Sequence, residues 1–391
     1  MKFFATLPGK RFIFAVPILL LCCVTGGCRE NAWPLWEAYS AHFIDRQGRV
    51  FDPQGDQHTT SEGQAYALFF SLVANNRAGF DRILNWTQTN LANGNLQHQL
   101  PAWLWGRDKD GESKILDANS AADADVWMAY SLIEAGRMWR YAPYTSLGRS
   151  MLVLVAKNEV ADLPGFGPML LPGSSGFQHG DKWTLNPSYL PPFLFDQLAA
   201  FDPAGPWSQI AVRIPALLEQ SARHGFAMDW VEYLPVDGFY PAVGLRPIAD
   251  KNTDEAGGSY DAIRVYLWAG MTYSKSPSRS RILNAVPSMA AYLSCHLAPP
   301  ERVSDQGIPL AKDAPIGFSA ALLPYLRAFP GGSRLAGCQL IRMAAQRSAS
   351  GLYGKDPVYY DQNLALFSTG FLDGRFRFGP RGELNVEWKL R

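Results

Sequence analysis

The chain has 391 residues, of which 47% are hydrophobic, so it is long and apolar enough to bury a large core in one domain or two modest ones. Its 36 Lys and Arg residues nearly balance its 35 Asp and Glu residues, and this balance argues against a basic surface for nucleic acid or for an anionic membrane. We therefore expect a neutral substrate and no nucleic-acid partner.

The N-terminus has the layout of a secretory signal peptide, which we place at residues 1–27. Basic residues precede an apolar stretch at residues 12–24, and small residues follow it before Cys28. The stretch is short for a membrane crossing, and no later segment approaches the roughly 20 apolar residues that a spanning helix needs. We expect an exported protein, periplasmic or secreted, without a transmembrane span in its mature form. Cys28 is a candidate for lipid attachment, although Thr25 stands where a lipoprotein signal usually has Leu.

Helical periodicity dominates the rest of the chain. Apolar residues recur at i, i+3 and i+4 spacing in a dozen segments: 34–43, 62–74, 79–91, 121–139, 146–159, 187–201, 208–223, 260–271, 278–295, 317–329, 334–349 and 358–370. Strict alternation is confined to residues 375–378 and, more weakly, 226–233. Because no low-complexity linker or charge block interrupts the pattern, we predict a single domain over residues 28–391, all-α with short β pieces in its loops.

The segments between the helices are rich in Gly, Pro and aromatic residues. Trp103 and Trp105 lie in one such loop, and Tyr189 lies in another. Prolines restrict the backbone of these loops, and the loops carry large side chains. A binding site mounted on a rigid scaffold needs both properties. A dozen helices with functional loops at their starts fit a closed double ring of helices. An open solenoid fits the helix count too, but no fixed-period repeat supports it.

Acidic residues stand at the predicted starts of three helices: Glu62, the pair Asp123 and Asp125, and Asp261. Taken singly, each has a structural interpretation. An acid in the first turn of a helix is favoured by the helix dipole by a few tenths to about 1 kcal/mol, which can explain Glu62 and one of the two aspartates. Asp261 and Arg264, three residues apart, can form a surface ion pair.

A catalytic interpretation of the same acids is glycoside hydrolysis, which needs one carboxylic acid to protonate the leaving oxygen and one carboxylate to activate water or attack carbon. Other hydrolytic chemistries fit the sequence less well. It contains no Gly-x-Ser-x-Gly, no phosphate-binding glycine loop and no His-Glu-x-x-His. Cys and His residues are not spaced as zinc ligands, so we expect no metal and no cofactor.

Together these segments resemble the three motifs of glycoside hydrolase family 8, which are here Thr59-Thr60-Ser61-Glu62-Gly63-Gln64, Asn119-Ser120-Ala121-Ala122-Asp123-Ala124-Asp125 and Ser259-Tyr260-Asp261-Ala262-Ile263-Arg264. The loops at residues 101–106 and 186–192, with Gly317-Phe318-Ser319-Ala320-Ala321, look like the branch of the family that accompanies bacterial cellulose synthase. The resemblance runs from about residue 33 to residue 383 with the motifs in order. It implies an (α/α)6 barrel, an endo-acting β-1,4-glucanase activity and an inverting mechanism.

Carried over motif by motif, the resemblance makes Glu62 the general acid and Asp261 the general base. Asp123 then stabilises the distorted sugar, because an inverting reaction has no covalent intermediate for it to form. Arg264 is expected to orient Asp261 or a sugar hydroxyl, and Asp125 is a further candidate for substrate binding. Trp103, Trp105 and Tyr189 are the candidates for stacking on pyranose rings.

The resemblance further implies a β-1,4-glucan substrate, a role in bacterial cellulose synthesis and the cellulose export complex as a candidate partner. Two alternatives stay open at this point. The same chemistry can act on chitosan, mixed-linkage glucan or xylan, and the chain can be a non-catalytic glucan-binding export factor. The sequence also leaves open whether Cys295 and Cys338 form a disulfide.

Overall fold

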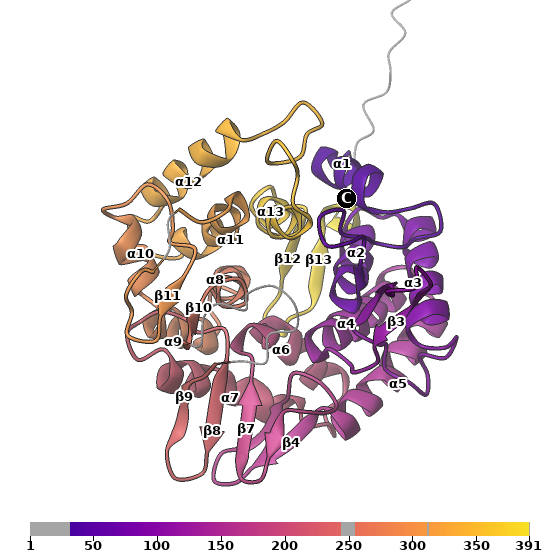
Figure 1. The fold of residues 1–391 in the computed structure, drawn as a ribbon, viewed down its shortest axis with the longest axis horizontal. Coiled ribbons are helices and arrows are strands. Elements are labelled where there is room, and N and C mark those ends of the chain that lie inside the picture. The colour runs from indigo at the N-terminus through magenta and orange to yellow at the C-terminus, as the bar shows by residue number, and fades with distance from the viewer. Residues whose placement is uncertain (1–31, 244–254, 311–312, 391) are drawn as a thin grey trace, which may run out of the picture. The chain divides into compact units, whose positions relative to one another are not determined.

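The computed structural model describes residues 32–243, 255–310 and 313–390 (Figure 1). The signal peptide and the candidate lipid site at Cys28 lie outside the described residues. Within them, 14 α-helices and short strands make up the fold, so the chain is mostly helical as predicted. The residues described from Trp33 onward belong to one compact unit.

Six helices line the middle of this unit (Figure 1), and each packs against the next along the chain. Apolar and small residues occupy all sides of most of these helices, which are therefore buried almost throughout. The six inner helices are α2 (Ser61–Val73), α4 (Ala122–Met138), α6 (Pro192–Phe201), α8 (Ala262–Met271), α11 (Ile316–Leu326) and α13 (Tyr359–Leu372).

Six further helices lie outside the inner ones, and each packs against one of them. Most bury a single face because their apolar residues follow the helical repeat. The pairs, outer helix first, are α1 (Pro34–Phe43) on α13, α3 (Arg77–Leu91) on α2, α5 (Ala142–Asn158) on α4, α7 (Trp207–Ser221) on α6, α9 (Pro277–Ala285) on α8 and α12 (Ser333–Ala345) on α11.

All twelve predicted helical segments coincide with helices, but two of them are interrupted. The segment at 187–201 begins with the 3₁₀ turn η1 (Pro187–Tyr189), and α6 starts only after Leu190. The segment at 278–295 divides into α9 and α10 (Ser288–Leu293) at Pro287, because proline cannot continue the backbone hydrogen bonds of a helix. A short α14 (Glu387–Leu390) was not predicted. No helix among the described residues has both the length and the apolar character needed to cross a membrane.

The β structure is more extensive than predicted, and all of its strand pairs are antiparallel. The strands form a three-stranded sheet of β1 (Thr59–Thr60), β2 (Leu104–Arg107) and β3 (Ser113–Asp117), a four-stranded sheet of β6 (Gln178–His179), β7 (Lys182–Leu185), β8 (Val231–Leu234) and β9 (Gly238–Pro241), and the pairs β4 (Val160–Leu163) with β5 (Gly167–Leu170), β10 (Gly257–Gly258) with β11 (Val303–Ser304), and β12 (Phe376–Phe378) with β13 (Leu384–Val386). The prediction at 375–378 is confirmed by β12. The one at 226–233 is right only for its last three residues, which belong to β8.

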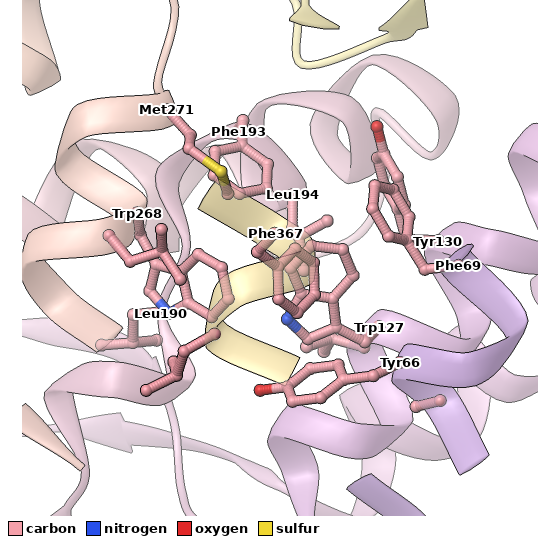
Figure 2. Packing of buried hydrophobic residues seen from close by; sticks show 14 of the residues in the cluster. Tyr66, Phe69, Trp127, Tyr130, Leu190, Phe193, Leu194, Trp268, Met271 and Phe367 are labelled. Carbon is pink, nitrogen blue, oxygen red and sulfur yellow. The ribbon is translucent and has the colours of Figure 1, made fainter. Parts of the chain in front are cut away.

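Aromatic side chains from the inner helices form the centre of the core (Figure 2). The ring of Trp127 on α4 lies 5.4 Å from that of Trp268 on α8, 5.1 Å from that of Phe367 on α13 and 5.0 Å from that of Phe69 on α2. Such ring pairs contribute beyond the area they bury. The core thus joins the helices whose N-terminal ends carry the predicted acids.

The two cysteines that follow Cys28 in the sequence do not form a disulfide. Cys295 is exposed and Cys338 is partly exposed, and both are free thiols. The question that the sequence left open is therefore answered in favour of unpaired cysteines.

Candidate active site

The three predicted catalytic acids meet at the N-terminal ends of three inner helices. Glu62 and Asp123 lie in the first turns of α2 and α4, and Asp261 is the N-cap residue of α8. Arg264 joins them: its Nη1 donates to Glu62 Oε2 and lies 3.4 Å from Asp123 Oδ2, and its Nη2 donates to Asp261 Oδ1 at 2.6 Å. One guanidinium group therefore gathers acids that are far apart in the sequence.

Glu62 is not the cap of its helix. That function belongs to Thr60, whose Oγ1 accepts a hydrogen bond from the N–H of Gly63 at 3.2 Å. Strand β1 precedes the helix and pairs with β2, and the N–H of Ser61 donates to the carbonyl of Trp103 at 3.0 Å. The backbone of this segment is thus fixed without the Glu62 carboxylate, which is left to bind Arg264.

Solvent exposure separates the acids into two kinds. The side chains of Glu62 and Asp261 keep 20% and 29% of their surface exposed, whereas Asp123 keeps 4%. Burial raises the pKa of Asp123 well above its ordinary value, and the negative charge of Glu62 raises it further, while Arg264 opposes the shift. Asp123 is therefore biased toward its neutral form, which suits a hydrogen-bond donor better than a nucleophile.

Arg264 is buried, with 3% of its side chain exposed, so the alternative of a surface ion pair with Asp261 is wrong. Its guanidinium also donates to Ser188 Oγ at 3.0 Å and to Tyr66 OH at 3.3 Å. The ring centroid of Tyr189 lies 5.6 Å from its Cζ atom, within the range of a cation–π contact. A buried cation is tolerated when opposite charges and hydrogen bonds surround it, and this one has both.

Trp103 lies between two of the acidic segments. Its carbonyl accepts from the N–H of Ser61, and its own N–H donates to the carbonyl of Asn119 at 2.8 Å. The half-buried indole lines a cavity of about 160 Å³ together with Thr60 and Tyr359. The backbone of Trp103 thus lies beside the segments that carry Glu62 and Asp123, and stacking of its indole on a sugar stays a prediction.

Trp105 lies further along β2, opposite Thr59 of β1. Its ring packs edge-to-face against Trp86, with centroids 5.4 Å apart, and Arg49 Cζ lies 4.5 Å from its centroid. Arg49 therefore covers part of the surface that was predicted for a pyranose ring. Trp105 is half-buried, which leaves only the rest of the indole available.

Asp125 does not face the other acids. Its side chain is fully buried, and the nearby carboxyl group of Glu159, at the end of α5, acts on it electrostatically. Burial raises the pKa of both groups, that of Glu159 to about 7. Ser120 Oγ donates to Glu159 Oε1 at 2.5 Å, which ties the pair to the segment before α4. This placement argues against the predicted contact between Asp125 and substrate and assigns it to the scaffold behind Asp123.

The raised pKa of Glu159 predicts a pH-dependent stability. Because the pKa of Glu159 is raised in the folded chain from 4.5 to about 7, the folded state loses stability as pH rises through that range. Glu159→Gln keeps an acceptor for Ser120 and supplies a permanent donor to Asp125. We expect this variant to be more stable than wild type at pH 8, by on the order of 1 kcal/mol, with little gain at pH 4.5. Urea unfolding at both pH values measures this, and an equal gain at both would contradict it.

Sequence reasoning missed several residues that contact the site. Ser188 and Tyr66 bind Arg264, and the hydroxyl of Tyr360 donates to the carbonyl of Tyr260, next to Asp261. Asp229 accepts hydrogen bonds from the backbone of the Asp261 segment. Only Asp229 carried a signal, because an acid within the apolar run at residues 226–233 is costly to bury without partners.

Metal ligation has no support in the part of the chain that the structure describes, where no group of three or more His, Cys, Asp or Glu side chains is arranged to hold an ion. The chemistry that the site offers is that of carboxyl groups held by an arginine. Two of them are open to solvent, and one is buried.

Comparisons with known proteins identify the family of the chain. The family profile described as glycosyl hydrolases family 8 matches residues 10–373. The chain is 45% identical to an endoglucanase of Xanthomonas axonopodis pv. citri over 91% of this chain and 90% of that protein. It is 42% identical to an endoglucanase of Escherichia coli K12 over 95% and 96% of the two chains.

A solved structure shares the fold closely. The crystal structure of an endo-1,4-D-glucanase from Vibrio fischeri superposes with a TM-score of 0.83, at 36% identity over 92% of this chain and 100% of that chain. Both the family profile and these relatives span most of the sequence, including all three acidic segments. The chain therefore belongs to family 8 of the glycosyl hydrolases.

Proposed function

We propose that the protein is an endo-1,4-β-glucanase whose inner and outer helices form an (α/α)6 barrel. The observation that carries the proposal is the convergence of Glu62, Asp123 and Asp261 on Arg264 in a family 8 chain. The relatives that cover nine-tenths or more of the chain at 36–45% identity are endoglucanases. A panel of neutral β-glucans, xylan and chitosan with product sizing tests the assignment, which predicts rapid shortening of β-1,4-glucan chains.

In the proposed mechanism Glu62 protonates the leaving glycosidic oxygen and Asp261 activates the attacking water. Both carboxylates keep contact with solvent, as groups that meet a sugar and a water must. They bind different nitrogens of Arg264, which holds them apart on either side of the guanidinium. Asp123, next to the same guanidinium, holds the distorted sugar at the cleavage point through a hydrogen bond to a sugar hydroxyl.

The proposed pairing of acid and base predicts inversion at the anomeric carbon, because water attacks directly from the face opposite the leaving group. Products of a β-linked substrate should therefore appear first as the α-anomer. Proton NMR of the earliest products measures the anomeric ratio before mutarotation equalises it. An initial excess of the β-anomer would contradict the assignment of Asp261 as the general base.

No observation favours the alternative substrates or a non-catalytic role. A glucan-binding export factor needs no ordered acid, base and arginine, yet here all three are held by hydrogen bonds. Chitosan carries amino groups and calls for additional acids near the site. Asp125, Glu159 and Asp229, which are acids close to the site among the described residues, are all buried and so cannot meet the amino groups of such a polymer. A neutral β-1,4-glucan thus remains the best-supported substrate.

We infer a role in bacterial cellulose synthesis from the sequence motifs, with the cellulose export complex as a candidate partner. The signal-peptide pattern at residues 1–27 supports export to the periplasm or beyond, and Cys28 offers a site for a lipid anchor. Cell fractionation of the wild-type protein tests export, and comparison with a Cys28→Ser variant tests the lipid anchor. Recovery of the wild-type protein from the cytoplasm would contradict export.

A further inference from the structure

Asp229 lies between α7 and β8, far from Asp261 in the sequence, and 5% of its surface is exposed. Its Oδ1 atom accepts hydrogen bonds from three backbone N–H groups: those of Ser259 at 2.7 Å, Asp261 at 3.1 Å and Ala262 at 2.8 Å. These three donors belong to the short segment that begins α8. A single carboxylate oxygen therefore fixes the backbone on which Asp261 is mounted.

The side chain of Asp261 does not cap the N-terminus of α8. An Asp at the N-cap position ordinarily folds back to accept from the first turn, but Asp261 makes no such bond. The N–H groups of Asp261 and Ala262 go to Asp229, and those of Ile263 and Arg264 go to the carbonyls of Ser259 and Asp261. With the first turn satisfied from elsewhere, the Asp261 carboxylate accepts a hydrogen bond from Arg264 Nη2 instead of capping the helix.

We propose that Asp229 is a positioning residue for the general base, holding the Asp261 backbone in place and keeping its carboxylate basic through a neighbouring negative charge. The inference rests on the proposed role of Asp261. An oxygen that accepts three N–H bonds is typical of a charged acceptor. Asp229 Oδ1 lies 3.1 Å from the backbone nitrogen of Asp261, and a negative charge so near a carboxylate favours its protonated form, so Asp229 strengthens the affinity of Asp261 for the proton of water.

Other charged or titratable groups also face Asp261, and they set the background against which Asp229 acts. Arg264 on the same helix binds it directly and favours its ionised form. Among the described residues, Asp123, Tyr189 and Tyr360, from two other inner helices and from η1, also interact electrostatically with Asp261. Glu62 binds the same guanidinium. All of them stay unchanged when Asp229 alone is replaced.

The test compares two variants on a neutral cello-oligosaccharide across pH. Asp229→Asn keeps an oxygen acceptor but removes the charge, so we expect the acid limb of kcat/KM to move toward lower pH by about half a pH unit. Its kcat should fall several-fold with KM unchanged. Asp229→Ala also removes the acceptor, and we expect its kcat to fall about 100-fold, because a displaced base costs roughly that much.

Asp45→Asn is a matched control, because Asp45 Oδ1 likewise accepts two backbone N–H bonds, those of Gln47 and Arg49, in a loop outside the site. It should leave the pH profile unmoved. An unmoved acid limb in Asp229→Asn, with only thermal stability lost in Asp229→Ala, would reduce Asp229 to a scaffold residue and overturn the inference. Asp261→Asn distinguishes a failure of this inference from a failure of the proposed function. If Asp261→Asn is inactive, a negative result at Asp229 leaves the proposed function standing. If Asp261→Asn stays active, the assignment of the base itself is wrong.

Discussion

Replacing Glu62 by Gln should lower kcat on carboxymethylcellulose by about 1,000-fold or more, because general acid catalysis contributes roughly 10²–10⁴-fold and an amide cannot supply the proton. Asp261→Asn should have a comparable effect through loss of the base. Both substitutions preserve size and leave oxygens that accept from Arg264. Release of reducing ends measures the loss, and thermal unfolding checks that the fold persists.

Glu37 provides the matched control for Glu62. It too lies in the first turn of a helix, α1, but it is exposed and on the outer layer. Glu37→Gln should retain wild-type activity. Wild-type-like activity in either Glu62→Gln or Asp261→Asn would refute the assignment of that residue.

Replacing Arg264 by Met should abolish activity and cost roughly 3–5 kcal/mol of stability at pH 7, since removing one partner of a buried ion pair leaves uncompensated charge. Without the guanidinium, the acids at the site lose their counter-charge and repel one another wherever they are ionised. Protonation relieves that repulsion, so the loss of stability should shrink as pH falls from 7 to 4. Arg264→Lys should fold better but remain poorly active, because one ammonium group cannot reproduce the fork that binds Glu62 and Asp261.

Urea unfolding at both pH values, with activity assays, measures these effects. Arg281 offers the comparison, because it makes a two-bonded ion pair with Glu219 at 2.6 and 2.8 Å on the exposed surface. Arg281→Met should cost no more than about 1 kcal/mol. A pH-independent penalty in Arg264→Met, or full activity in Arg264→Lys, would show that the arginine does not act by gathering the acids.

The inner and outer helices could be predicted from the sequence because burial on one or all sides imposes a 3.6-residue repeat. Strands β6 and β7 could not, since they have two and four residues and are too short to display alternation. The pairing of β7 with β8, from a distant part of the chain, is a tertiary effect that no local pattern carries.

The site likewise has residues that could be predicted from the sequence and contacts that could not. Glu62, Asp123 and Asp261 stand out because each acid interrupts an apolar or hydroxyl-rich motif. That Asp125 turns away from them could not be foreseen, since its partner Glu159 lies at the end of another helix. Arg264 was expected to orient Asp261 or a sugar hydroxyl. Its contacts with α2 and α4 depend on how the inner helices pack, which is a property of the assembled core.

The span of chain between the residues that meet at Arg264 decides how the protein can be divided. Its bond to Glu62 bridges 202 residues, and its contact with Asp123 bridges 141. A fragment that ends before Asp261 therefore contains Glu62 and Asp123 but lacks Asp261 and Arg264. The complementary fragment contains Asp261 and Arg264 but lacks the other two acids. Each motif supplies a residue, but only the undivided run of inner helices from α2 to α8 brings together the ion cluster on which the proposed chemistry depends.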